Sequence, residues 1–328
     1  MLGSELARDN SLGGSLIGNA DTRMMAYSPL ESGQPVTAWI DEHRAALFED
    51  LHEYGAVLLR GVIDGPELLD QVARAVGGDL LEYTERTTPR STVSGNVYTS
   101  TEYPANQTIP QHNESAYSRH SPRWLFFACV TPSETGGETP LADSAAVLRR
   151  LPADLVARFR ELGVLYTRSY RPGMGLTWQE VFQTDSKAEV EKFCGDNLLE
   201  LEWLGDDELR TRSRRPAIVT DPDTGRDVWF NQAHLFHVTN LPKKVRAAIV
   251  EMYDEADYPR HALYGDGSPI ADTDLELIRK AYEDTIFANP WGRGDLMIVN
   301  NLLVSHGRRP YTGARRVLVA MTGVFDSV

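Results

Sequence analysis

The sequence is short of cysteine, of long apolar runs and of positive charge. Two cysteines in 328 residues, Cys129 and Cys194, are too few for a disulfide framework, so we expect them to be packing residues. No stretch approaches the roughly 18 apolar residues of a membrane-spanning helix, and the first thirty residues show no secretory signal, which favours a cytoplasmic protein. With 33 Lys and Arg against 47 Asp and Glu, the formal net charge of −14 repels phosphates, so neither nucleic acid nor a membrane surface is an expected partner.

What is present is typical of a globular protein with one large domain or two small ones, since 41% of the residues are apolar and 24% are charged. Helical periodicity alternates with β-branched and aromatic runs. The predicted helices span residues 35–54, 69–76, 153–162, 178–193, 242–257 and 272–288. The predicted strands span residues 56–60, 124–130, 217–220, 226–230, 295–300 and 316–321, with further short strands between 92 and 130. We expect an α+β fold in which one β core carries helical insertions and flanking helices.

The first 34 residues show no sustained periodicity and are rich in Gly, Ser and Asn. We therefore predict a flexible N-terminal arm over residues 1–34, followed by a single domain over residues 35–328. No internal repeat and no long linker divides that domain.

The first chemical signal is the tripeptide His112-Asn113-Glu114, within a segment that has strand character. Side chains alternate along a strand, so the imidazole and the carboxylate would share one face and Asn113 would point to the other. Such a pair can chelate a divalent metal, although a His beside a Glu is more often a simple hydrogen-bonded pair. The tripeptide alone therefore leaves both interpretations open, a metal site and a hydrogen-bonded pair.

A third ligand would complete a facial triad of two histidines and one carboxylate, with positions left open for a cosubstrate and O2. His306, at the end of the apolar run 296–304, is the obvious candidate. Arg316 enters the last strong strand, where its guanidinium could bind a metal-chelating dicarboxylate in a forked pair. Thr139, after the tight Gly136-Gly137 turn, could donate its hydroxyl to the same carboxylate.

Taken together, these motifs resemble those of the taurine dioxygenase (TauD/TfdA) family of iron(II)/2-oxoglutarate dioxygenases. Within that family, the segments 100–104, 112–114 and 306–313 are most similar to the syringomycin-type hydroxylases of peptide natural-product assembly. The likeness covers roughly residues 56–323. It implies a double-stranded β-helix, or jelly-roll, core.

The resemblance implies that His112, Glu114 and His306 bind Fe(II), and that Thr139 and Arg316 hold 2-oxoglutarate. Arg316 fits the family's register after the second histidine, whereas Arg315 would point to the opposite face of a strand. The implied reaction couples decarboxylation of 2-oxoglutarate by O2, giving succinate and CO2, to hydroxylation of an unactivated C–H bond.

Two positions refine this expectation. Related halogenases have a small residue in place of the carboxylate, so Glu114 favours hydroxylation over halogenation. Family members that act on free sulfonates or amino acids often carry a second arginine four residues after the first, where this sequence has Ala320. We therefore expect an amino-acid-derived substrate whose carboxylate is absent or masked, for instance as a thioester on a carrier protein.

Other polar residues have weaker signals. Arg86, Tyr103 and Asn113 are candidates for substrate binding because they lie in or before the iron motif. His234 and His237 are spaced like metal ligands, but no Glu-x-x-His motif accompanies them, and structural roles are favoured. A basic run could bind an acidic carrier protein or its pantetheine phosphate, but pairing with neighbouring acidic residues is the favoured interpretation. Its members are Arg210, Arg212, Arg214 and Arg215.

Two alternatives to hydroxylation stay open. The same cofactors can support desaturation, epoxidation or cyclisation, because the outcome depends on the pose of the substrate and not on the ligand set. A more distant alternative is a binding protein that kept the β core and lost catalysis. Oligomeric state and substrate identity are not predicted.

Overall fold

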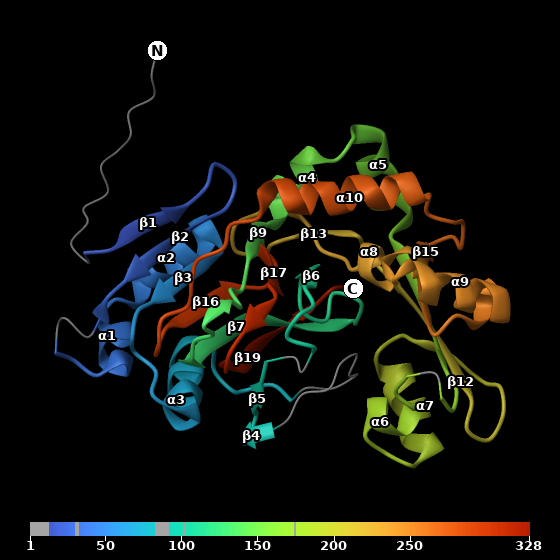
Figure 1. Cartoon of the computed structure of the whole chain (residues 1–328), viewed down its shortest axis with the longest axis horizontal. Helices are drawn as coiled ribbons and strands as arrows, with labels where there is room; N and C mark the ends of the chain where they lie inside the picture. The colour runs from blue at the N-terminus through green and yellow to red at the C-terminus, as the bar shows by residue number, and fades with distance from the viewer. Residues whose placement is uncertain (1–12, 30–32, 83–91, 101–102, 174) are drawn as a thin grey trace.

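A computed structural model describes residues 13–29, 33–82, 92–100, 103–173 and 175–328 (Figure 1). Its largest element is an eight-stranded sheet of order β1-β2-β3-β16-β7-β19-β5-β4. The strands are β1 (Ser15–Gly18), β2 (Arg23–Tyr27), β3 (Ala56–Leu59), β4 (Thr92–Ser94), β5 (Val97–Thr99), β7 (His120–Thr131), β16 (Leu296–Asn300) and β19 (Arg316–Asp326). Because β3 and β16 are buried along their whole length, both faces of this sheet must be covered.

Three helices cover one face: α1 (Val36–Glu42), α2 (Arg44–Tyr54) and α3 (Pro66–Gly77). In Figure 1 they are the blue helices beside the large sheet. Helix α3 buries Leu69, Val72 and Val76, one stripe at helical spacing, in a core shared with the sheet. Gly55 ends α2 with φ 74°, and a Cβ there would lie 2.2 Å from Cγ2 of Val304, so both the turn and the close approach require glycine.

Smaller sheets cover the other face. One consists of β6 (Ile109–His112), β17 (Val304–Arg308) and β9 (Leu141–Asp143), and another pairs β8 (Thr135–Gly136) with β18 (Tyr311–Thr312). A second apolar core lies between these strands and the large sheet. Its members include Phe127, Leu141, Val304, Val317 and Val319. The strand that carries His306 is thereby packed against the centre of the large sheet.

The middle of the chain forms a separate four-stranded sheet with helices around it. Its strands, in order, are β11 (Glu200–Trp203), β12 (Leu209–Arg215), β10 (Val164–Tyr170) and β15 (Arg260–Tyr264). Nearby lie a hairpin of β13 (Ile218–Thr220) and β14 (Asp227–Trp229) and two 3-10 helices, η2 (Val238–Asn240) and η3 (Glu255–Asp257). The α-helices of this part are α4 (Ser144–Arg150), α5 (Ala153–Leu162), α6 (Trp178–Phe182), α7 (Lys187–Asp196), α8 (Ala233–Phe236), α9 (Lys243–Met252) and α10 (Asp272–Thr285).

Several sequence-based expectations differ from this structure. The predicted helix over 35–54 breaks at His43 into α1 and α2, and the one over 242–257 ends at Met252 as α9 and is followed by η3. The described part of the predicted flexible arm contributes β1 and β2, which join the large sheet, because β2 pairs in parallel with β3 and buries Met24 and Tyr27. The predicted helix over 178–193 is two helices, since Gln183 adopts φ 56° and ends the first, and Ser186 caps the second. Strands β10 and β12 were not predicted.

Other expectations agree with the structure. A mixed α and β fold with large sheets is observed, and both cysteines are unbridged and buried. Burial raises the pKa of the Cys129 thiol to about 11, so it stays protonated at neutral pH. Among the described residues, no helix is long and apolar enough to cross a lipid bilayer.

Candidate metal centre

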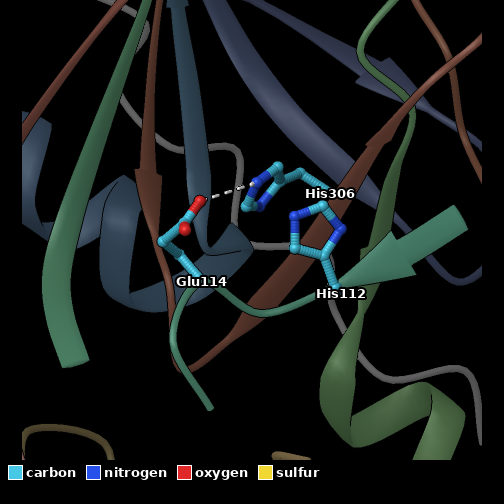
Figure 2. Close-up of side chains that lie close together, drawn as sticks. All are labelled: His112, Glu114 and His306. Atoms are coloured by element: carbon cyan, nitrogen blue, oxygen red, sulfur yellow. Dashed lines mark ion pairs between the residues drawn. The ribbon is translucent and has the colours of Figure 1, made fainter. Parts of the chain in front are cut away.

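His112, Glu114 and His306 lie together between the sheets (Figure 2). Each offers one ligand atom, and these atoms lie within 4.8 Å of one another. Nε2 of His306 is 3.8 Å from Oε2 of Glu114, and the centroids of the two imidazole rings are 4.3 Å apart. Two imidazoles and one carboxylate with this spacing fit the facial triad of a non-haem Fe(II) site.

Strand pairing brings the two histidines together across most of the sequence. His112 is the last residue of β6, and His306 is its direct partner on the antiparallel strand β17. Directly opposed side chains in such a pair lie about 5 Å apart on one face of the sheet. The long-range register, and not local sequence, therefore creates the histidine pair.

Glu114 reaches the site by a different route from the one predicted. Strand β6 ends at His112, and Glu114 lies in the following turn, where Ser115 has φ 55°. The buried side chain of Asn301 holds this turn by hydrogen bonding to both backbone groups of Glu114. Its Oδ1 accepts from the backbone N–H of Glu114 at 2.7 Å, and its Nδ2 donates to the carbonyl of Glu114 at 3.0 Å. Hydrogen bonding to Asn301, and not strand alternation, places the carboxylate.

A backbone contact sets the tautomer of His112. Nδ1 lies 2.9 Å from the carbonyl oxygen of Pro110, which can only accept, so Nδ1 carries the proton. The lone pair of Nε2 is then left for a metal, which is the usual arrangement for a ligating histidine. On the other side of the pair, the ring of Phe127 packs 4.9 Å from that of His306.

The two histidines also line a small cavity with four polar side chains: Ser100, Thr139, Arg308 and Arg315. Thr139 is buried, and Nε1 of Trp291 donates to its hydroxyl oxygen at 3.3 Å. The O–H of Thr139 is therefore free to donate to an acceptor in the cavity.

Arg315 is held in a fixed orientation at the wall of this cavity. Its Nε donates to the carbonyl of Gly137 at 2.8 Å, and Nη1 donates to the hydroxyl of Ser100 at 3.2 Å. Burial, helped by the charge of Arg308, lowers the pKa of Arg315 to about 10, which leaves it cationic at neutral pH. A partly buried, oriented guanidinium of this kind can bind a carboxylate in a forked pair.

Arg316, which the sequence predicted for this role, is placed elsewhere. Its side chain is exposed at the start of β19, and it does not line the cavity. Arg315, Val317 and Val319 alternate onto the cavity, whereas Leu318 and Ala320 pack toward the helices. The side chains of β19 alternate regularly here, since the extra residue behind the register shift between Arg316 and Val317 is Val130 on β7. Arg315 therefore lies on the cavity face that the sequence assigned to Arg316.

Of the three residues predicted to bind substrate, the structure describes Asn113 and Tyr103. Asn113 is fully buried and donates to the carbonyl of Asn301 at 2.6 Å and to the hydroxyl of Ser144 at 3.2 Å, which gives it a structural role, and its contact with substrate stays a prediction. Tyr103 is 41% exposed and does not line the iron-ligand cavity. Arg86 lies outside the described residues.

The sequence did not predict the part played by Arg308. Its guanidinium donates to the carbonyls of Tyr103, Pro104 and Gln107, so it fixes the segment before β6 while lining the cavity. The only signal in the sequence was its position two residues after His306, which places both on the same side of β17.

Two further histidines, and two arginines of the basic run, have roles in the structure itself. Burial lowers the pKa of both His234 and His237 to about 3, so both are neutral, and neither belongs to the three-ligand cluster. Arg210 pairs with Glu202 at 2.9 Å, and Arg214 pairs with Glu200 at 2.7 Å. Pairing with neighbouring acidic residues, the favoured interpretation of the run, agrees with these contacts.

Comparison with known proteins now decides the family. Residues 28–322 match the model of the taurine catabolism dioxygenase TauD, TfdA family. The chain belongs to this family. It is 42% identical over 305 residues to the dapdiamide synthesis protein DdaC of Enterobacter agglomerans, covering 89% of this chain and 93% of that protein. It is 35% identical over 283 residues to a clavaminate synthase-like protein of Arabidopsis thaliana, covering 83% and 82%.

Solved structures agree with this TauD family fold. PvcB of Pseudomonas aeruginosa matches with a TM-score of 0.52 and 16% identity over 94% of this chain and 90% of that one. Another PvcB structure, described as an Fe, alpha-ketoglutarate dependent oxygenase from an isonitrile synthetic pathway, gives a TM-score of 0.53 and 17% identity over 98% and 94%. At such identities the likeness concerns the fold alone.

Family membership identifies the protein as a non-haem iron(II)/2-oxoglutarate-dependent dioxygenase, with Fe²⁺, 2-oxoglutarate and O2 as its cofactor and cosubstrates. It also implies the jelly-roll type of core for the sheets that enclose the His-Glu-His cluster. The similarity to syringomycin-type hydroxylases stays a prediction.

Proposed function

We propose that this dioxygenase oxidises an unactivated C–H bond of an amino-acid-derived small molecule in a biosynthetic pathway. His112, Glu114 and His306 would bind the iron, and Arg315 with Thr139 would bind the distal carboxylate of 2-oxoglutarate. The observation that carries the proposal is the shared cavity, which is lined both by two members of the three-ligand cluster, His112 and His306, and by the oriented guanidinium of Arg315.

Bound iron(II) and 2-oxoglutarate would supply the oxidising chemistry, and the chain's own residues define where it acts. Arg315 supplies positive charge and two N–H donors to the dianionic cosubstrate, on a protein whose net charge is −14. Phe127, Val317 and Val319 give the cavity apolar walls, which exclude water from the reacting centre.

Hydroxylation is the proposed outcome, because Glu114 occupies a coordination position that a halogenase leaves for chloride. Desaturation, epoxidation and cyclisation use the same ligands, and the mass of the product separates desaturation and most ring closures from hydroxylation. Hydroxylation and epoxidation each add one oxygen, whereas desaturation and most ring closures remove two hydrogens.

The substrate proposal rests on relatives and on one side chain. DdaC is named for dapdiamide synthesis, and PvcB is described as part of an isonitrile synthetic pathway, which favours small-molecule biosynthesis here as well. Four residues after Arg315 stands Val319, which lines the cavity. Because Val319 is as unable as Ala320 to bind a carboxylate, the proposal of a masked acid, such as a carrier-bound thioester, is retained.

The proposal is tested by substrate-dependent succinate formation in the wild type and in His112→Ala. Loss of one of three ligands should reduce turnover at least 100-fold and weaken Fe(II) binding, measured anaerobically by calorimetry. His120→Ala is the matched control, since His120 is exposed at the start of β7 and bonds Asn197. Equal turnover in His112→Ala and the wild type would place the iron site elsewhere.

The form of the substrate is tested separately by offering free amino acids and their carrier-bound thioesters and reading products by mass. Efficient oxidation of the free acid alone would contradict the masked-carboxylate proposal while leaving the iron site unaffected.

A further inference from the structure

A second cavity, of about 390 Å³, lies between the four-stranded sheet and helices α8 and α9. In Figure 1 these helices stand beside β15. Most of its lining is apolar and includes Leu176, Phe236, Val238, Leu241, Val245 and Ile249. Two arginines, Arg168 and Arg260, lie in the same lining. A cavity of this composition fits a ligand with a mainly apolar body and an anionic group.

The two arginines are direct neighbours across the strands. Arg168 of β10 is the antiparallel partner of Arg260 of β15, so both guanidinium groups emerge on one face. Like charges directly opposite one another destabilise a sheet, and a bound anion would relieve that repulsion.

Arg260 has no acidic partner among the described residues, unlike other arginines nearby. Arg210 and Arg171 both pair with Asp257, whereas the guanidinium of Arg260 lies 5.9 Å from the ring of Phe236. Burial, followed by the charge of Arg168, lowers the pKa of Arg260. A partly buried guanidinium that has no carboxylate partner within the described protein can bind an anionic group of a ligand.

A chain of contacts links this cavity to the iron ligands. The ring of Phe236 lies 5.1 Å from that of Tyr117, which follows Glu114 by three residues in the same turn. Tyr103 lies near enough to Arg260 to influence its pKa, and the carbonyl of Tyr103 is held by Arg308 of the iron-ligand cavity. A ligand that reaches from one cavity to the other is therefore consistent with the arrangement of these side chains.

We propose that Arg260, with Arg168 beside it, binds an anionic group of the substrate, whose apolar part lies along this cavity. That group is the phosphate of the pantetheine arm where the acid is masked as a carrier-bound thioester, and the carboxylate itself where the acid is free. This inference rests on the proposed function, since it assigns a binding subsite for the substrate of the same centre.

The test measures binding of two pairs of probes to the iron-loaded protein by calorimetry without O2. One pair is 4′-phosphopantetheine and pantetheine, and the other is a set of N-acetyl amino acids and their carboxamides. We expect the wild type to prefer the anionic member of one pair, and Arg260→Gln to weaken that member at least tenfold without changing the neutral member. The pair that responds identifies the source of the anion.

Arg260→Lys keeps the charge and should restore most of the affinity, and thermal melting of each variant verifies folding. Arg214→Gln is the matched control, because Arg214 lies on the same sheet and already pairs with Glu200. Wild-type protein that binds neither anionic probe, or Arg260→Gln that binds both as tightly as the wild type, would overturn the proposal.

The absorption band of the anaerobic Fe(II) and 2-oxoglutarate complex separates this failure from failure of the proposed function. We expect the band to form equally in the wild type and in Arg260→Gln. If it is absent from the wild type, the iron-site proposal fails, whereas the dependence of probe binding on Arg260 still decides the subsite.

Discussion

At the scale of single residues, the adjacent arginines 315 and 316 show how differently two identical side chains can be placed. Arg315 is partly buried and is oriented by Gly137 and Ser100, whereas Arg316 is exposed at the start of β19. Burying a guanidinium costs free energy that an anion bound beside it can offset. Arg315 therefore has both the position and the electrostatic need for 2-oxoglutarate.

We expect Arg315→Gln to raise KM for 2-oxoglutarate about 10- to 100-fold, because a charge-assisted hydrogen bond contributes roughly 1.5–3 kcal/mol. Arg316→Gln makes the same change in charge one residue away and should leave KM within about twofold. Initial rates of succinate formation at varied 2-oxoglutarate measure both. The reverse pattern would assign the cosubstrate to Arg316.

Much of this site could be predicted from the sequence, but not the strand face on which each of the two arginines lies. The motifs around His112, Thr139 and His306, through their resemblance to the TauD family, were sufficient to group these residues. The choice between Arg315 and Arg316 depended on which residues of β19 alternate onto the cavity, and motif spacing did not determine that. Even Glu114 was grouped correctly for an incorrect reason, since a turn fixed by Asn301 holds it and not a strand.

At the scale of elements, the turn that follows β8 supports the cosubstrate cavity. Gly136 and Gly137 have φ 65° and 73°, a left-handed conformation that glycine adopts at little cost. A Cβ on Gly137 would lie 2.4 Å from Oγ of Ser133 and 3.0 Å from Cδ of Arg315. The absence of a side chain there leaves room for Arg315 to reach the cavity.

Gly137→Ala should therefore displace Arg315, raise KM for 2-oxoglutarate several-fold and lower stability by about 1–2 kcal/mol, the usual cost of a left-handed residue with a side chain. Gly225→Ala is the control, since Gly225 has φ 68° and nothing within 4 Å of its Cβ position. It should cost similar stability with no change in KM, as steady-state kinetics and thermal melting would reveal. Equal KM values in the two variants would contradict the role given to the turn.

At the scale of the whole molecule, buried histidines make folding sensitive to acid. His237 lies in the turn between α8 and η2, with its ring 4.3 Å from that of His261 and the charges of Asp272, Arg279 and Arg246 around it. Burial lowers its pKa to about 3, against about 6.5 in the unfolded chain. Above pH 6.5 the histidine is neutral in both states. As the pH falls below 6.5, only the unfolded chain takes up the proton, so stability is lost.

We expect His237→Asn to lose less stability than the wild type between pH 7 and pH 5, by about 2 kcal/mol. Asparagine can still accept the hydrogen bond that Nδ1 of His237 takes from the backbone of Thr239. Urea unfolding of both proteins at the two pH values measures the difference. Parallel losses in both proteins would show that His237 does not contribute to acid sensitivity.

Across the whole molecule, the sequence predicted the helices better than the strands. Periodicity located α3, α5 and α10 because one apolar stripe is a local property of a helix. Strand β12 was missed because four arginines lie along it, although Leu209, Thr211 and Ser213 alternate inward as in any strand. Strand β2 depends on pairing with β3, a distant partner that local composition does not reveal, and β1 pairs in turn with β2.

The direct pairing of His112 with His306 has a consequence for biosynthesis of the protein itself. Strand β17 is synthesised long after β6, so a growing chain has no complete ligand set until the whole segment between these two strands has been made. We therefore expect iron to enter after the β sheets have closed around the site. Redox chemistry would then start only when apolar walls already shield the rest of the chain from its products.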